Sequence, residues 1–459
     1  MSKIFSHTRP LFAFGTQKAF SSIISNFECR PTQCLYFNSS INPTIAELGI
    51  SGIKILSHFA WESLLLNIHQ GLFSPRIPAN SQINLQSLSS LDLLIARRLF
   101  NRHILSIGNH NLFDYLSEVL LSHILLWLKE FRPESVYSPE VPHQYGDFML
   151  VCACRILNIP IYFCRAVGAV SQELFSIHSP FQTHCINLEF KHSSKSLAEI
   201  YAIEKIYNNI SSQIRPYPVD KQLQQRSSRS KSNKEFLSKL TTESDESVRS
   251  IVFLQNKIDM HLYYIKNSST PDFGAKNLVL YLHYEPEANS VPCGYSYYDQ
   301  LTFASKLGSF CFEAGVNLYI KEHPDQLTLP IAGYDVNQHF LTSPHLNPRD
   351  ITFYKLLRNL PSFKGFLHGV STETLLIQRV PCATLTGSVG LQFSANNIPT
   401  IISGPTYYEK LHHVKKIHQI ESASSLIRHL ESNCTPDQVL SKAQFISCIL
   451  PIVASTNNL

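Results

Sequence analysis

The chain lacks several features that would place it in a familiar class of protein. Its 459 residues contain no uninterrupted apolar stretch long enough to span a membrane, and no basic block interleaved with aromatic residues. They also contain no Cys-x-x-Cys pair and no Asp-x-Asp element, two common spacings of metal-binding side chains. These absences argue against a membrane-spanning protein, a nucleic-acid-binding protein and a metal-dependent site.

Cysteine use indicates the compartment. The eleven cysteines are odd in number, and Cys152 and Cys154 lie two apart in a run typical of a buried helix, where such neighbours do not face each other. Free, mostly buried thiols indicate a reducing environment. We expect a cytoplasmic protein with at most peripheral contact at the inner face of the membrane.

Length and hydrophobic content predict more than one core. A chain of this length that is 44% hydrophobic, with a net charge of only +5, is expected to form two or three domains. Helix and strand patterns alternate between residues 112 and 163, which predicts an α/β fold with helices on both faces of a parallel sheet. The expected parts are an N-terminal extension (1–29), a first domain (30–190), a connection (191–275) with an exposed polar loop at 220–246, and a second domain (276–459).

Three polar signatures in the second half of the chain each follow a strand-like apolar run. They are His-Tyr-Glu-Pro-Glu at 283–287, Lys-Glu-His-Pro at 321–324 and Thr-Gly-Ser-Val-Gly at 386–390. Ligands collect outside the carboxyl ends of the strands of an open parallel sheet, so these groups can converge on one crevice. The pattern predicts a ligand site.

The third signature predicts an anion site at the start of a helix. Backbone N–H groups and the helix dipole attract a phosphate there. Gly387 and Gly390 let the phosphate come close, and Thr386 and Ser388 add hydroxyl donors. The alternative is an ordinary strand-to-helix turn with Ser388 as its N-cap.

Lys321 and His323 supply a second reason to expect an anion. Residues two apart in a strand point to the same side, so these side chains project together while Glu322 faces away. A cation beside an imidazole suits a phosphate leaving group, through charge neutralisation and proton donation. The alternative is a histidine satisfied by nearby backbone and a solvated lysine.

Four further side chains are candidates for acid–base chemistry. His283, Glu285 and Glu287 alternate along the chain and share one face of an extended segment, with Glu287 favoured because it lies deepest in the loop. Asp147, near a loop of the first domain, is a candidate for activating an acceptor. The alternatives are solvated carboxylates, a helix cap and, for Asp147, ordinary turn chemistry.

Together these motifs resemble bacterial capsule and surface polysaccharide biosynthesis proteins, which are related to transferases that use CMP-activated sugars. The resemblance covers roughly residues 275–410 and includes Gly404–Tyr408. It implies a GT-B-like architecture, two Rossmann-like domains facing each other across a cleft, with the nucleotide on the second domain and Tyr407 near its base or sugar. Similar proteins carry a Glu where this chain has Gln392, whose amide still forms a hydrogen bond with a ribose, without charge assistance.

The resemblance implies a glycosyltransferase of surface or capsular polysaccharide biosynthesis. Such an enzyme moves a sugar from a nucleotide-sugar donor, acidic in the case of CMP, onto a glycan or lipid-linked acceptor. Because Lys321 and His323 can neutralise the leaving phosphate, we expect no metal and no cofactor beyond the donor itself. Two alternatives stay open: a CDP-polyol phosphotransferase of the teichoic-acid type, and a non-catalytic glycan-binding protein, which Gln392 favours.

Overall fold

The computed structural model divides the chain into two compact units. Unit 1 comprises Met1–Glu204, Pro405–Tyr407 and Ile446–Leu459, and unit 2 comprises Lys205–Gly404 and Tyr408–Phe445. The structure describes residues 10–13, 33–35, 54–56, 85–104, 110–138, 141–142, 145–166, 174–178, 203–208, 245–285, 293–294, 297–327, 349–432, 442–449 and 453–455.

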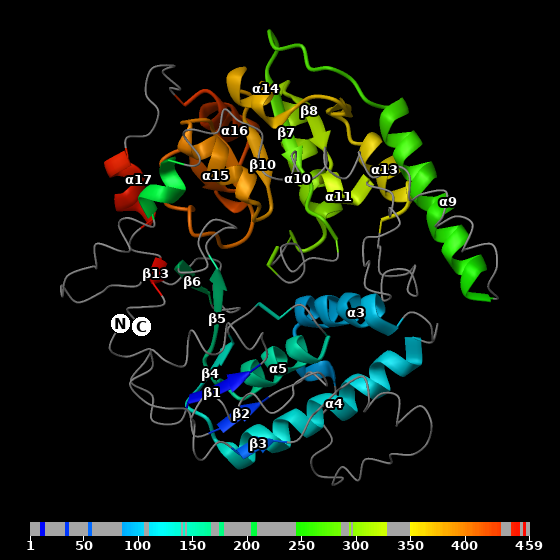
Figure 1. Cartoon of the computed structure of the whole chain (residues 1–459), viewed down its shortest axis with the longest axis vertical. Helices are drawn as coiled ribbons and strands as arrows, with labels where there is room; N and C mark the ends of the chain where they lie inside the picture. The colour runs from blue at the N-terminus through cyan, green and yellow to red at the C-terminus, as the bar shows by residue number, and fades with distance from the viewer. Residues whose placement is uncertain are drawn as a thin grey trace. The chain divides into compact units, whose positions relative to one another are not determined.

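The described strands of unit 1 form one seven-stranded sheet in the order β13-β6-β5-β4-β1-β2-β3 (Figure 1). Strands β1 to β5 are parallel, and β6 is antiparallel to β5. Numbered along the chain and starting from β3, the strands run 3-2-1-4-5-6, which is the Rossmann-like order. The elements are β1 (Pro10–Ala13), β2 (Gln33–Leu35), β3 (Lys54–Leu56), η3 (Leu85–Ser87), α3 (Ser90–Ile104), α4 (His110–Phe131), β4 (Ser135–Ser138), α5 (Tyr145–Ile156), β5 (Ile161–Ala166), β6 (Leu174–His178) and β13 (Val453–Ser455).

Two strands of this sheet differ from the expected division of the chain. β1 pairs in parallel with both β2 and β4, so the first sheet begins inside the segment 1–29, which was predicted to be an extension. β13 pairs with β6, although the second domain was predicted to extend to residue 459. Each of the two strands has four residues or fewer, which is too short for an alternating pattern to appear in the sequence.

The described strands of unit 2 form a parallel sheet in the order β12-β11-β10-β7-β8-β9. Numbered along the unit, this is again 3-2-1-4-5-6. The elements are α9 (Asp245–Lys266), β7 (Asn277–Tyr281), α10 (Gln300–Ala314), β8 (Asn317–Lys321), α11 (Pro324–Leu327), α13 (Ile351–Arg358), β9 (Phe363–Phe366), α14 (Thr372–Ile377), β10 (Cys382–Thr384), α15 (Ser388–Ala395), β11 (Thr400–Ile402), β12 (Val414–Lys416), η8 (Ile417–Gln419) and α16 (Ala423–Leu430); α17 (Lys442–Ile449) crosses the boundary of the units.

Helices cover both faces of the second sheet. Leu278 and Leu280 of β7 pack in one core cluster with side chains of α9, α10, α13 and α16. Val279 and Tyr281 pack in another with side chains of α14 and α15. Successive strand residues point to opposite faces, so β7 is buried along its whole length, and its residues 278–281 form a continuous apolar run after the buried Asn277.

Helix ends in unit 2 follow local signals. Asp299 caps α10 by accepting from the backbone N of Leu301 at 3.1 Å. Gly315 ends that helix in the left-handed conformation, with φ of 62°, which glycine adopts without steric cost. Asp350 and Ser422 cap α13 and α16 in the same way as Asp299 caps α10.

The predicted fold class is confirmed. Each sheet, taken by itself, has the strand order of a Rossmann-like unit, and an α/β chain with two such units is the composition expected of a GT-B-type protein. α4, β4, α5 and β5 alternate along the chain as predicted for residues 112–163, and β7, β8 and β10 are the strands that precede the three polar signatures. Residues 220–244 of the predicted polar loop lie outside the described residues. The helix α9 begins at Asp245, within the last part of the predicted loop. Among the described helices, none has the length and apolar content needed to cross a membrane.

His429 predicts a pH dependence of the stability of unit 2. Its imidazole is buried on α16, where Nε2 donates to the carbonyl oxygen of Thr400 at 3.2 Å, and burial lowers its pKa to about 4. The unfolded chain binds this proton near pH 6.5 and the folded chain only near pH 4. The free energy of unfolding should therefore fall by about 3 kcal/mol as the pH drops between these values, with no further loss below them.

Denaturant unfolding followed by far-UV circular dichroism measures this loss. Trp61 and Trp127, the two tryptophans of the chain, both belong to unit 1, so their fluorescence follows the other unit and serves as an internal reference. His429→Gln should flatten the pH dependence, and His418→Gln, at an exposed position in η8, should leave it unchanged. If the free energy of unfolding changed equally with pH in wild type and His429→Gln, the prediction would be contradicted.

Candidate functional site

The predicted signatures meet at the carboxyl edge of the second sheet. β7 lies between β8 and β10, and the strand order reverses at the boundary of β7 and β10. Ligands of open α/β sheets bind in the crevice outside the carboxyl ends of the strands at this boundary. The segments that follow β7, β8 and β10 here are 282–285, 322–323 and 385–388.

His283 connects the ends of β7 and β10. Its side chain is buried, and Nε2 lies 3.1 Å from the backbone N of Thr386 and 3.1 Å from Oγ1 of Thr384. A backbone N–H can only donate, so Nε2 is an acceptor and the neutral ring carries its proton on Nδ1. His283, predicted as a catalytic residue, therefore holds the start of the Thr-Gly-Ser loop in place.

The glycines of this loop are required by neighbouring side chains of the protein. A Cβ on Gly387 would lie 2.7 Å from Thr384 Oγ1 and 3.2 Å from His283 Cε1. A Cβ on Gly390 would lie 2.6 Å from Oη of Tyr408, and that hydroxyl donates to the carbonyl oxygen of Gly387 at 2.5 Å. Only glycine leaves room for these contacts.

The first turn of α15 has no side-chain cap. Gly387 is the N-cap residue, and Ser388 is the first helical residue, with an exposed side chain. The alternative in which Ser388 is the N-cap is therefore wrong. The backbone N–H groups that a helix start leaves without intrahelical partners, together with the dipole, favour an anion. Gln392 lies half-buried on the same helix.

The side chains at the end of β8 alternate as predicted. Glu322 is buried, whereas Lys321 and His323 are half-buried. Lys321 Nζ donates to the carbonyl oxygen of Val370, beyond β9, at 2.5 Å. The ring of His323 lies beside the ring of Tyr284, with the centroids 5.7 Å apart. Both basic side chains lie at the carboxyl end of the strand next to β7.

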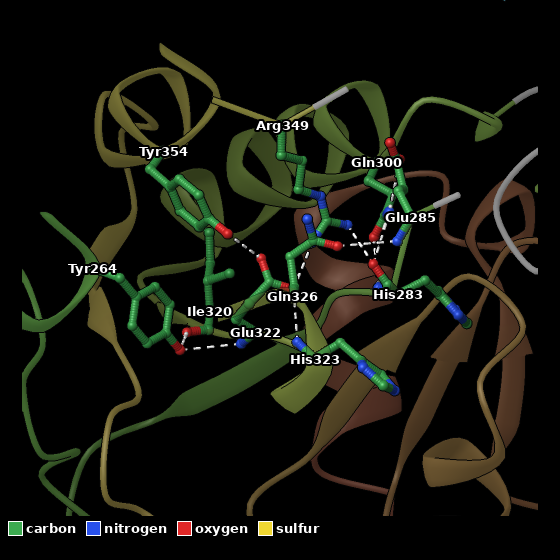
Figure 2. A network of polar contacts seen from close by, with 10 residues as sticks. All are labelled: Tyr264, His283, Glu285, Gln300, Ile320, Glu322, His323, Gln326, Arg349 and Tyr354. Carbon is green, nitrogen blue, oxygen red and sulfur yellow. Dashed lines mark hydrogen bonds and ion pairs between the residues drawn. The ribbon is translucent and has the colours of Figure 1, made fainter. Parts of the chain in front are cut away.

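Glu322 is the centre of a buried polar network (Figure 2). Its carboxylate accepts from Arg349 Nη1 at 2.5 Å, from Tyr354 Oη at 2.6 Å and from the backbone N of His323 at 2.6 Å. Its own backbone N donates to Tyr264 Oη at 3.0 Å. The side chains of Arg349 and Glu322 are each 1% exposed, so this ion pair lies in the low-dielectric interior.

The same network holds the turn after β7. Gln300 accepts from the backbone N of His283 at 2.7 Å and donates to Glu285 Oε1 at 2.9 Å. Arg349 Nη2 donates to the carbonyl oxygen of His283 at 2.5 Å, and the backbone N of Glu285 donates to Gln326 at 3.1 Å. Figure 2 shows the rings of His283 and His323 extending away from Arg349. Three separate segments of the chain thus fix one turn.

One arginine faces two buried acids. Burial alone acts to lower the pKa of Arg349, but Glu322 and then Glu285 outweigh it and raise that pKa above its ordinary value. Burial, and next the charge of Glu322, raise the pKa of Tyr354. Both shifts favour a charged Arg349 and a protonated Tyr354 hydroxyl that donates its hydrogen bond.

The described site residues that were predicted from sequence are distributed over both units. Those that come together at the carboxyl edge of unit 2 are His283, Glu285, Lys321, His323, Thr386, Gly387, Ser388 and Gly390. Asp147 is buried in the first turn of α5 in unit 1, and Tyr407 also belongs to unit 1. Glu287, the favoured catalytic carboxylate, lies outside the described residues.

Sequence reasoning missed most of the residues that hold this edge. Those residues are Tyr264, Gln300, Gln326, Arg349 and Tyr354. Their positions follow no local motif, since Tyr264 and Arg349 lie 58 residues before and 27 residues after Glu322. The single local signal was the alternation along β8, which turns a carboxylate inward, where it requires partners.

The carboxyl edge is the better candidate than the other features of unit 2. The described residues contain no group of three or more His, Cys, Asp or Glu side chains that could hold a metal ion. A cavity of about 190 Å³ lies at the opposite edge, around the starts of β7, β8 and β10. Its charged side chains are engaged, because Lys276 pairs with Glu431 at 2.6 Å and Arg379 donates to the carbonyl oxygen of Asn397 at 3.0 Å.

No family model matches the chain, and no curated protein sequence matches it. Among solved structures, it is similar to the KpsC beta Kdo 2,7 transferase of Thermosulfurimonas dismutans, at 12% identity and a TM-score of 0.24 over 48% of this chain. It spans 64% of the length of that transferase chain. It is also similar to the UDP-GlcNAc 2-epimerase of Neisseria meningitidis bound to UDP-GlcNAc, at 11% identity and a TM-score of 0.24 over 96% of this chain and 98% of that one. The calicheamicin glycosyltransferase CalG4 is similar at 12% identity and a TM-score of 0.23, over 97% of this chain and 94% of the CalG4 chain.

TM-scores and identities this low establish no family. The assignment of the fold class therefore rests on the strand orders of the two sheets.

The buried ion pair predicts a large loss of stability when its cation is removed. Arg349→Met leaves the Glu322 carboxylate buried without its guanidinium and should lower the free energy of unfolding of unit 2 by about 3–5 kcal/mol. The Lys276–Glu431 pair is a matched control of similar length, 2.6 Å, whose side chains are 58% and 54% exposed. Lys276→Met should therefore cost at most about 1 kcal/mol.

Chemical denaturation followed by far-UV circular dichroism measures both variants. The double variant Arg349→Met/Glu322→Gln also removes the carboxylate that pairs directly with Arg349 and should recover part of the loss. Equal effects of Arg349→Met and Lys276→Met would show that burial gives this ion pair no special weight.

Proposed function

We propose that unit 2 binds a nucleotide-sugar at the carboxyl edge of its sheet and that the protein is a metal-independent glycosyltransferase. One observation carries this proposal. The start of α15 has no side-chain cap, is held by His283, and lies at the same edge of the sheet as the ends of β7 and β8, where the strand order reverses. Nucleotides bind at this position in Rossmann-like sheets.

The proposed leaving group is a nucleoside phosphate. The first N–H groups of α15 and the Ser388 hydroxyl donate to its oxygens, and Lys321 adds a positive charge nearby. His323 donates a proton to the oxygen that leaves as the bond to the sugar breaks. Charge that develops on the phosphate is thereby neutralised by the protein alone.

The carboxylates have separate roles in this proposal. Glu285 is buried and accepts from Gln300, so it holds the turn and takes no part in proton transfer. Glu287 is the proposed general base or stabiliser of an oxocarbenium-like sugar, as its sequence position suggests. Asp147 of unit 1 is the proposed residue for acceptor activation, and Tyr407 the one near the base or sugar.

The substrate class follows from the sequence resemblance. It supports a role in surface or capsular polysaccharide synthesis, with an acidic sugar on CMP as donor and a glycan or a lipid-linked saccharide as acceptor. A CDP-polyol phosphotransferase would use the same phosphate-binding groups. Gln392, half-buried on α15, favours the third alternative, a protein that binds glycans without turnover.

A thermal-shift screen with CMP, CDP, UDP and GDP tests the donor site. CMP should stabilise the protein most, by about 2.7 kcal/mol at a concentration 100 times its Kd. His323→Ala should remove most of this stabilisation without lowering the melting temperature of the unliganded protein, because the ring is half-buried at the edge. Ser388→Ala should weaken binding in the same direction, by at most about 1.5–3 kcal/mol.

His418→Ala, at an exposed histidine of the same unit, is the matched control and should bind CMP like wild type. A lowered melting temperature of His323→Ala with unchanged nucleotide affinity would instead assign a structural role to this histidine.

Glu287→Gln tests the proposed chemistry. The substitution keeps the shape and removes the charge, so turnover should be lost while CMP affinity stays within a few-fold of wild type, as expected of a group that acts in the transition state. Wild-type turnover should survive EDTA. Strict dependence on added magnesium or manganese would refute the metal-free mechanism, and an active Glu287→Gln would remove this residue from it.

A further inference from the structure

The turn after β7 is held by buried polar side chains from three other segments of the chain. Gln300 bonds both the backbone N and the carbonyl oxygen of His283, at 2.7 and 3.2 Å, and Arg349 donates to the same carbonyl at 2.5 Å. The backbone N of Glu285 donates to Gln326 at 3.1 Å. Gln300, Gln326 and Arg349 are themselves buried, so they cannot drift with solvent. The residue between the two held positions is Tyr284.

Tyr284 lies on the opposite side of the turn from its neighbours. His283 and Glu285 are buried, at 6% and 2% exposure, whereas Tyr284 is half-buried. The alternation follows from the extended backbone, which points successive side chains to opposite sides. Holding the peptide groups on both sides of Tyr284 therefore fixes where its ring is presented.

The ring of Tyr284 lies at the carboxyl edge, next to the proposed phosphate-binding groups. Its centroid is 5.7 Å from that of the His323 ring, and the two planes are tilted by 40°. Tyr264 and Tyr354 belong to one described core cluster of unit 2, and Tyr281 and Tyr319 belong to the other. Tyr284 is a member of neither of these described clusters and lies half-buried at the edge.

We propose that Tyr284 is a specificity-determining residue, whose ring packs against the nucleoside of the donor while His323 contacts the phosphate. This inference rests on the proposed function and adds the ligand class. The ligand is a nucleotide, whose base or ribose contacts the ring, and not a phosphorylated compound in general. Aromatic faces bind bases by stacking, and a ring fixed before binding loses little conformational freedom when the ligand arrives. The held turn therefore prepares the nucleoside part of the site, and the α15 start prepares the phosphate part.

The test measures the affinities of CMP, UDP and inorganic pyrophosphate for each full-length variant. Tyr284→Leu should weaken CMP and UDP about tenfold or more and leave pyrophosphate unchanged, because only the nucleotides carry a base. Tyr284→Phe keeps the ring and should retain all three affinities. Tyr115→Leu, at a tyrosine of α4 that is 51% exposed, is the matched control and should behave like wild type.

Each outcome decides the inference. The ratio of nucleotide to pyrophosphate affinity is taken within one variant, so a smaller folded fraction of Tyr284→Leu cancels. Equal weakening of nucleotides and pyrophosphate would show that the ring acts through His323 and would overturn the inference, as would unchanged affinities. If the wild-type protein bound pyrophosphate but neither nucleotide, the proposed function would be refuted as well. This result comes from the wild-type protein alone and does not depend on the tyrosine variants.

Discussion

The buried contact between Arg349 and Glu322 is the interaction on which the candidate site depends. Withdrawing both charges from water is costly, and the pair is stable only because further hydrogen bonds complete it. Glu322 also accepts from Tyr354, and Arg349 also donates to the carbonyl oxygen of His283. The guanidinium thus joins the end of β7, the end of β8 and the start of α13. The positions of His283 and His323 both follow from it.

This arrangement divides the charged groups of the edge by sign. The carboxylates of Glu285 and Glu322 are buried and directed at Arg349, Gln300 and Tyr354. The half-buried side chains at the end of β8 are Lys321 and His323. The basic side chains are therefore partly exposed at this edge, while the acids lie in the interior. Residues 321–323, Lys-Glu-His, supply both the basic side chains and a buried acid, because successive side chains of an extended backbone point to opposite sides.

Local patterns predicted the strands of unit 2 well but could not predict the network. The bounds of β8 follow from a short apolar run, and the inward direction of Glu322 follows from the alternation of side chains from Lys321 to His323. Arg349 is 27 residues away and belongs to no motif, so its partner is chosen by the fold. Gly390, predicted to let a phosphate come close, also leaves space for the hydroxyl of Tyr408, a contact from beyond β11 that no local motif indicates. Sequence thus indicated which strand ends lie at one edge of the sheet, and tertiary contacts decided which of their side chains are buried.

The need for a polar interior at this edge follows from the backbone. Where parallel strands end, their N–H and C=O groups lose ladder partners, and a buried group left unpaired costs about 1–3 kcal/mol. An apolar core could replace the Arg349–Glu322 pair, but it would leave the carbonyl oxygen of His283 without its Arg349 donor. Gln300, Gln326 and Arg349 satisfy the peptide groups of the turn and fix one conformation of it. A strand end that must present side chains to a ligand in a set geometry therefore requires buried polar groups behind it, and those groups lie too far along the chain for any local motif to reveal them.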